Sequence, residues 1–88
     1  MFNQKRANKF LNKLVKVTWK DIFSEIRQNR ETVDKAKIID LLALCTSFGV
    51  IYKIDDYGIV LVSEFSGNEI DYTVIPYGNI LNIEIKGG

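Results

Sequence analysis

The chain has 88 residues, of which 47% are hydrophobic and 26% charged, and its formal net charge is +1. A chain of this length builds one modest core, and this composition excludes a disordered tail and a fibrous repeat. It contains no histidine and a single cysteine, Cys45, which excludes a zinc site, a histidine-activated nucleophile and an internal disulfide.

No apolar run reaches about 18 residues, the length of a membrane span, and no secretory leader is visible. We therefore expect one cytoplasmic domain, residues 1–88, with no membrane segment. We expect it not to be an enzyme and to need neither a metal nor a cofactor. Cys45 lies in an apolar stretch, so we expect its side chain to be buried and to act as a small hydrophobic residue.

The charge is distributed unevenly. Residues 1–37 carry ten basic and four acidic side chains, whereas residues 38–88 carry two basic and seven acidic ones. A basic N-terminal region on an acidic body is typical of a solvated helix face, or of a contact surface for phosphates or for an acidic protein.

Residues 1–14 are predicted to form a basic amphipathic helix with Asn3 as its N-cap. Four apolar residues at helical spacing form its buried face: Ala7, Phe10, Leu11 and Leu14. Four basic residues form a stripe that faces solvent: Lys5, Arg6, Lys9 and Lys13.

Residues 15–20 alternate between apolar and polar side chains, which predicts a strand. Its apolar members are expected to face the core: Val15, Val17 and Trp19. Its polar members are expected to face solvent, where the two lysines continue the basic stripe: Lys16, Thr18 and Lys20.

A helical insertion around residues 24–41 is expected next. Polar residues predict a loop over 24–32, and Thr32 is a candidate N-cap for a helix over 33–40. The apolar run 38–44 fits either a helix end or a buried strand, and periodicity does not decide between them. We expect a strand from about residue 42.

Four strands with short connections follow. Gly49 interrupts the first of them and predicts a sharp bend. Turn residues at 55–58 and 66–69 bound a strand over 59–65, and Pro76 ends a strand over 70–75. The last strand spans 80–85, with Leu81, Ile83 and Ile85 expected to face the core.

This order predicts a mainly β fold with an N-terminal helix (α+β), namely a small five-stranded antiparallel barrel over residues 15–86. Tyr72 is expected to face the core. The rest of the expected core comprises Val15, Val17, Trp19, Ile51 or Tyr52, Val60, Val62, Val74, Ile83 and Ile85.

Two short motifs resemble a group of small bacteriophage and prophage proteins. Val17-Thr18-Trp19-Lys20-Asp21 is similar to their Val-x-Trp-x-Asp start. Ile75-Pro76-Tyr77-Gly78-Asn79-Ile80 is similar to their Ile-Pro-x-Gly-x-Ile finish. The resemblance implies a phage-derived origin, with the cytoplasm of the bacterial host as the compartment, and no particular activity.

The order of elements also resembles the Sm-like fold of RNA-binding ring proteins, and an SH3-like barrel fits nearly as well. Gly49 with Asp55 resembles the first Sm motif, and Tyr77-Gly78-Asn79-Ile80 resembles the Arg-Gly segment of the second. The chain departs from both motifs, because Tyr77 replaces the basic residue and the asparagine of the first motif has no clear counterpart. The resemblance implies a homo-oligomer formed through barrel edge strands.

Two functions remain open. The first is an Sm-like binding module for nucleic acid or a nucleotide, with Lys5, Arg6, Lys9, Lys13, Lys16, Lys20, Tyr57 and Tyr77 as its binding residues. The two tyrosines lie in turns and are candidates for a base-stacking pair. The second is a phage accessory or anti-defence protein that binds a host protein, which the acidic second half favours. Asp55 and Asp56 are interpreted as turn residues, with no catalytic or metal-binding role.

Overall fold

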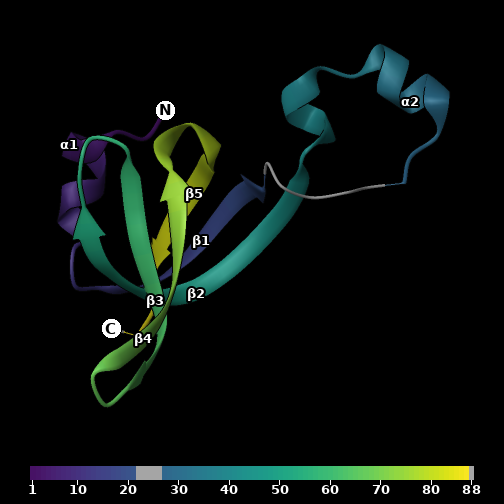
Figure 1. Ribbon diagram of the computed structural model, residues 1–88. Coiled ribbons are helices and arrows are strands. Elements are labelled where there is room, and N and C mark those ends of the chain that lie inside the picture. Colours follow the sequence, from purple (N-terminus) through teal and green to yellow (C-terminus); the bar gives the residue numbers. More distant parts are fainter. Residues whose placement is uncertain (22–26, 88) are drawn as a thin grey trace.

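A computed structural model describes residues 1–21 and 27–87 (Figure 1). Its helical elements are α1 (Gln4–Ala7), η1 (Asn8–Phe10), α2 (Arg30–Lys35), η2 (Ile38–Leu41) and η3 (Tyr77–Asn79). Its strands are β1 (Leu14–Asp21), β2 (Ala43–Ile54), β3 (Gly58–Ser66), β4 (Glu69–Pro76) and β5 (Ile80–Ile85). The protein is therefore mostly β with a short N-terminal helix, as predicted.

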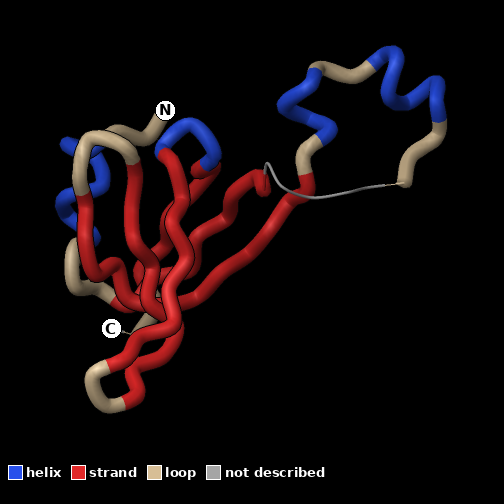
Figure 2. Tube along the Cα trace, viewed as in Figure 1, coloured by secondary structure: helices blue, strands red, loops and turns tan. Residues whose placement is uncertain are grey.

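The five strands form one antiparallel sheet in the order β4-β3-β2-β1-β5. The sheet is strongly curved (Figures 1 and 2). It is not closed, because β4 and β5 are its two edges and neither pairs with the other among the described residues. The five strands confirm the predicted number, whereas a closed barrel is not formed.

Gly49 lies in β2 where this strand, already paired with β1, begins to pair with β3: Gly49 pairs with Val15, and the next residue, Val50, pairs with Val62. A Cβ atom at this position would stand 2.3 Å from the carbonyl oxygen of Val62. The backbones of β2 and β3 therefore approach each other at a distance that only glycine permits, and the predicted role of Gly49 at a bend is supported.

The core is formed by the sheet together with α1 and η1, which contribute Ala7 and Phe10. Its buried members are Phe2, Ala7, Phe10, Val15, Val17, Ile51, Ile59, Leu61, Ile75, Tyr77, Ile80 and Ile83. Val62 is also buried, and Trp19 is partly buried against this cluster. Val15, Val17, Ile51, Val62 and Ile83 were predicted correctly.

Other expected core residues were assigned to the wrong face. Tyr72 and Val74 are exposed, and Val60 is only partly buried. Of the two alternatives Ile51 and Tyr52, Ile51 is the buried residue and Tyr52 is exposed. The wrong assignments arise because residues 59–62 are all apolar, so alternation does not show which face is buried. The pair Ile59–Ile75 faces the core, and the next pair along the ladder, Val60–Val74, faces outward.

Residues of β5 were also misassigned. Thr18 pairs with Asn82, but Trp19 pairs with Ile80, so Leu81 is the extra residue of a β-bulge. The bulge buries Ile80 and leaves Leu81 51% exposed. Ile85 pairs with Val15 at the end of this edge strand and is half-exposed for that reason.

The N-terminal helix is shorter than the predicted 1–14. Asn3 caps it as expected, because its side chain accepts a hydrogen bond from the Arg6 N–H at 2.9 Å. The helical structure ends at Phe10, and Asn12 then takes a positive φ of 64°. Backbone hydrogen bonds between residues 12–13 and Ile51 replace the helical ones, which leaves Leu11 and Leu14 exposed.

The insertion projects away from the sheet as an arm, residues 27–42 (Figure 1). Asn29 caps α2 in place of Thr32, and Ala36 is extended, so the predicted helix over 33–40 is wrong. Residues 38–41 form the 3-10 helix η2, and β2 begins at Ala43, close to the predicted strand start. Residues 24–26 of the predicted loop lie outside the described residues.

Candidate functional site

Two turns that are far apart in the sequence meet at one end of the sheet. The first is the β2–β3 turn, residues 55–57, and the second is η3. The Tyr77 N–H donates to the carbonyl oxygen of Tyr57 at 3.3 Å, and the Tyr77 hydroxyl donates to the carbonyl oxygen of Asp55. Asp55 and η3 come from the two segments that were compared with the Sm motifs, and the fold brings these two segments together.

The carboxylate of Asp55 is occupied within its own turn. It accepts hydrogen bonds from the N–H groups of Tyr57 at 2.9 Å and Gly58 at 3.4 Å. This arrangement confirms the interpretation of Asp55 as a turn residue. Burial raises the pKa of the nearby Tyr77 phenol, and the negative charges of Asp55 and Asp56 raise it further.

The two candidate tyrosines have opposite environments. Tyr57 is 63% exposed, whereas Tyr77 is 7% exposed and belongs to the core. The predicted stacking pair is therefore wrong, because the ring of Tyr77 is used for packing and its hydroxyl for the adjacent turn.

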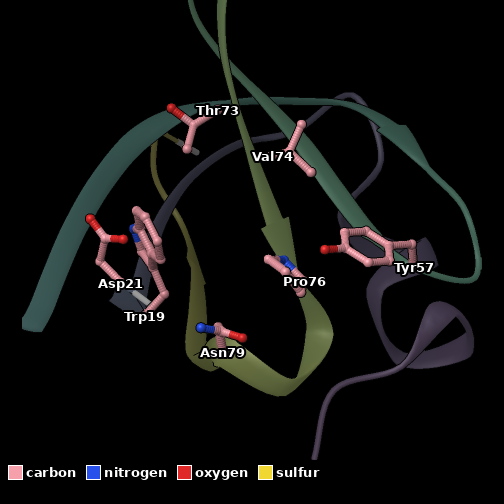
Figure 3. A pocket seen from close by; sticks show the side chains of 7 residues that line it. All are labelled: Trp19, Asp21, Tyr57, Thr73, Val74, Pro76 and Asn79. Carbon is pink, nitrogen blue, oxygen red and sulfur yellow. The ribbon is translucent and has the colours of Figure 1, made fainter. Parts of the chain in front are cut away.

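A hollow of about 330 Å³ lies beside these turns. Its lining comes from β1, the β2–β3 turn, β4 and η3: Trp19, Asp21, Tyr57, Thr73, Val74, Pro76 and Asn79. Figure 3 shows Trp19 and Asp21 on one side and Tyr57 on the other, with Pro76 between them. We call it the Trp19–Tyr57 hollow. Two aromatic rings thus stand on opposite sides of a mainly apolar space that contains a few polar groups.

The walls of this hollow are held by specific hydrogen bonds. The indole Nε1 of Trp19 donates to the hydroxyl of Ser47 on β2 at 3.0 Å. The side-chain Nδ2 of Asn79 donates to the carbonyl oxygen of Lys20 at 2.6 Å, which ties η3 to β1. Trp19 and Asn79 are therefore each held by a hydrogen bond to a neighbouring strand.

A second, smaller hollow of about 180 Å³ adjoins the first, and Tyr57 and Val74 line both. Its lining includes Lys53 and Asp55. Tyr57 therefore stands between an aromatic, apolar space on one side and a lysine side chain on the other.

The basic residues do not form one continuous stripe. Lys5 and Lys9 lie on α1 and η1, but Lys13 lies after the helix has ended. The Arg6 guanidinium lies 4.4 Å from the Phe2 ring centroid and donates to the carbonyl oxygen of Met1 at 2.8 Å. Lys9, by comparison, is exposed, with its ammonium 5.1 Å from the Phe10 ring centroid.

The two lysines of β1 are engaged elsewhere. The ammonium of Lys16 lies 3.3 Å from a carboxylate oxygen of Glu84 on β5. The ammonium of Lys20 donates to the carbonyl oxygen of Leu42 at 3.5 Å. Lys5, Lys9 and Lys13 remain the exposed lysines of the N-terminal region, and no described carboxylate pairs with them.

Sequence reasoning missed Trp19, Asp21, Lys53, Pro76 and Asn79 as site residues. The motif segments contained four of them, and the missing information was which segments meet.

Cys45, expected to be buried, is only partly buried and lies outside the core. Within the described residues, no three potential ligands gather as a metal site, and no helix is long and apolar enough to cross a membrane. No protein-family model matches the chain, and comparisons with curated proteins and solved structures find no match.

Proposed function

We propose that this protein is a non-enzymatic module that binds single-stranded nucleic acid and takes one base into the Trp19–Tyr57 hollow. The observation that carries the proposal is the pair of aromatic rings on opposite sides of a fixed, mainly apolar space. Base–aromatic stacking contributes about 1–3 kcal/mol per base and accepts any base, because every base has a π face.

A path for the phosphate backbone leads away from the hollow over Tyr57. Lys53 lines the adjoining hollow together with Asp55. The segment that follows α1 and η1 is hydrogen-bonded to Ile51 of the same strand, β2 (Figure 1). Lys5 and Lys9 on α1 and η1 are exposed. A phosphate backbone that leaves the hollow over Tyr57 would then meet Lys53, with Lys5 and Lys9 as the further cations of this proposal.

The proposal includes an Sm-like or SH3-like barrel that is completed by homo-oligomerisation at the sheet edges. Tyr57 and Tyr77 form a hydrogen-bonded pair at the end of the β3–β4 ladder. Along an antiparallel ladder such pairs alternate with non-hydrogen-bonded pairs, whose backbone groups point away from the partner strand. Val74 and Tyr72 therefore turn their backbone N–H and C=O groups toward the open side of β4. Pro76 lies two residues after Val74 and faces the same open side, so its missing N–H removes no hydrogen bond to β3. This free edge supports strand pairing with a second copy.

Trp19 is the only tryptophan, so its fluorescence reports directly on the hollow. We expect a single-stranded oligonucleotide to quench it. Tyr57→Ala is expected to weaken binding about fivefold or more, because it removes one stacking partner. Tyr72→Ala is the matched control, since Tyr72 is equally exposed but lies outside the hollow. Quenching that is equal in both variants would contradict the proposal.

Salt dependence tests the backbone path separately. Each phosphate neutralised on a single strand steepens the plot of log K against log[salt] by about 0.7. Three contacts by Lys5, Lys9 and Lys53 give a slope of about −2. Lys9→Glu with Lys53→Glu is expected to flatten the slope without unfolding the protein, because neither side chain is in the core.

A second candidate function, binding of a host protein, is supported by a different surface. The outer faces of β2, β3 and β4 expose large apolar side chains: Leu44, Phe48, Tyr52, Phe65 and Tyr72. The rings of Tyr52 and Phe65 lie 6.1 Å apart and form one cluster. If this surface is the functional one, Phe48→Asp will abolish capture of a host protein, while Tyr57→Ala will leave it intact.

A further inference from the structure

Strand β4 is an edge of the sheet whose outward backbone groups have no partner among the described residues. Tyr72 and Val74 turn their N–H and C=O groups away from β3, and no described residue outside the sheet hydrogen-bonds to them. The side chains of both residues, and that of Thr73 between them, are exposed. An exposed edge of this kind is a template for a further strand.

The other edge of the sheet, β5, offers a shorter row of such groups. Its outward N–H and C=O groups belong to Ile83 and Ile85, and the bulge at Leu81 then interrupts the row. Strand β4 itself carries no bulge, because the register shift between β3 and β4 falls at Ser63 of β3. Bulges are one of the devices that keep an edge from pairing. Strand β4 is therefore the edge that the fold leaves open to a partner.

Charge on β4 favours one alignment with an antiparallel copy of the same strand. Glu69 and Asp71 are exposed, and no described basic side chain forms an ion pair with either. An alignment centred on Asp71 places the carboxylates of the two copies directly opposite each other, which is destabilising. An alignment centred on Thr73 separates them and pairs Tyr72 of each copy with Val74 of the other. An aromatic side chain opposite a β-branched one is a favourable combination across strands.

We infer that β4 pairs with β4 of a second copy around a two-fold axis at Thr73, and that this dimer carries two Trp19–Tyr57 hollows side by side. The same surface of both copies is used, as in most dimers with two-fold symmetry. Tyr72 and Val74 of each copy exchange both N–H···O=C hydrogen bonds with their counterparts. The inference rests on the proposed function for the ligand of the hollows, and it names the edge, the alignment and the partner.

The pairing gives the dimer two adjoining base sites. Thr73 lines the hollow of its own copy, and directly opposite residues of an antiparallel pair share a face of the sheet. The two hollows therefore flank the axis on the same face of the extended sheet. A single strand that fills both is held twice, and its second contact benefits from a high effective concentration. Because pairing of two edge strands buries a small interface, the dimer is expected to be weak without such a ligand.

Hydrogen exchange of the unchanged protein tests which edge pairs. The outward amides of Tyr72 and Val74 are expected to exchange fast in dilute solution and to slow about tenfold or more at high protein concentration. The outward amides of Ile83 and Ile85 on β5 are the matched control and are expected to keep their rates. Slowing at β5, alone or together with β4, would assign the contact to the other edge, and slowing at neither would indicate a monomer. Each of these results would overturn the inference.

A disulfide tests the alignment. The Cα atoms of the two Thr73 residues form a non-hydrogen-bonded pair, about 4.5 Å apart, which a disulfide can span. Thr73→Cys treated with oxidised glutathione is therefore expected to give a covalent dimer. Asp71→Cys is the matched control and is expected to give none, because its counterpart lies too far along the strand. Both variants also carry Cys45→Ser, which removes the native thiol. Cross-linking of both variants alike, or of neither, would overturn the alignment at Thr73.

Thymidine strands of two lengths separate this inference from the proposed function. Quenching of Trp19 is expected to show that a strand of about ten nucleotides binds about tenfold or more tightly than a dinucleotide, which fills one hollow. Tyr72→Pro removes an outward N–H that β3 does not use and is expected to abolish this gain while the dinucleotide still binds. Tyr72→Ala keeps the N–H and is the matched control.

The outcomes of this experiment differ for the two ideas. A gain from length that is equal in Tyr72→Pro and Tyr72→Ala would overturn the paired hollows and leave the single base site standing. Quenching by neither strand, with the β4 amides still protected at high protein concentration, would overturn the proposed function and leave the β4 dimer standing.

Discussion

The sheet and the arm of this protein are stabilised in different ways. In the sheet, Val15, Val17 and Ile51 are fully buried, and each strand pairs with at least one neighbour. In the arm, α2 buries no residue, and Ile38 is 81% exposed. Helix α2 depends on its Asn29 cap and on the Lys35–Glu31 ion pair, at 2.6 Å, within one helical turn. The comparison predicts that the stability of the sheet does not depend on the described part of the arm.

The same substitution in the two regions tests this most directly. Ile51→Ala removes a fully buried side chain from the core and is expected to cost about 2–5 kcal/mol of unfolding free energy. Ile38→Ala removes an exposed side chain of the same kind and is expected to change it by about 0.5 kcal/mol or less. Urea unfolding of both variants measures the difference. Similar losses of unfolding free energy in the two variants would show that Ile38 in the arm packs against other residues as closely as Ile51 does in β2.

The sheet could be predicted from sequence because strand signals are local. Alternation over residues 15–20, the turn residues at 55–58 and 66–69, and Pro76 locate strands and turns without any knowledge of their partners. The faces of β3 and β5 could not be predicted in this way. Residues 59–62 are all apolar, and the bulge at Leu81 depends on how β5 pairs with β1.

The site was harder to predict than the strands, because it is assembled from distant segments. Tyr57 was singled out, but its partner across the hollow, Trp19, lies 38 positions earlier and was missed as a site residue. Trp19 does pack partly against the core, as alternation predicted, and it lines the hollow as well. Tyr77 is the second error. Its turn position favoured exposure, yet hydrogen bonds to the neighbouring turn hold its ring in the core. Both errors concern contacts between segments.

Tyr77 provides a test of how the sheet end is held together. Tyr77→Phe removes the hydrogen bond to the carbonyl oxygen of Asp55 and is expected to cost about 1 kcal/mol at neutral pH. Because the pKa of Tyr77 is raised in the fold, its stabilising effect is complete below the ordinary value of about 10 and is lost as pH rises through the folded value.

Unfolding free energies measured from neutral to alkaline pH check this prediction. The gap between the two proteins is expected to narrow above about pH 10, where the wild-type phenol ionises and the phenylalanine of the variant has no proton to lose. A gap that stays constant across that range would show that the phenol has the same pKa in the folded and unfolded states, which would contradict a pKa raised by the fold.

The smallest expected effect on global stability concerns the two helix caps, one in each region. Asn29 and Asn3 make the same interaction, accepting a hydrogen bond from a first-turn N–H at 2.8 and 2.9 Å. Replacing such a cap by alanine costs its helix about 1 kcal/mol. Helix α1 places Ala7 in the core, so Asn3→Ala is expected to lower the global unfolding free energy. Helix α2 buries nothing, so Asn29→Ala is expected to leave the global value unchanged.

The loss at Asn29 is instead expected to be local. The amide of Val33 donates to the carbonyl oxygen of Asn29, and the amide of Ala36 donates to that of Thr32. Hydrogen exchange at these two amides is expected to accelerate about fivefold in Asn29→Ala, since local opening becomes easier by about 1 kcal/mol. Amides of β1 and β2 serve as the internal control and are expected to keep their rates. If their exchange accelerates as well, or if Asn29→Ala lowers global stability as Asn3→Ala does, then the arm and the sheet unfold as one unit and their separation does not hold.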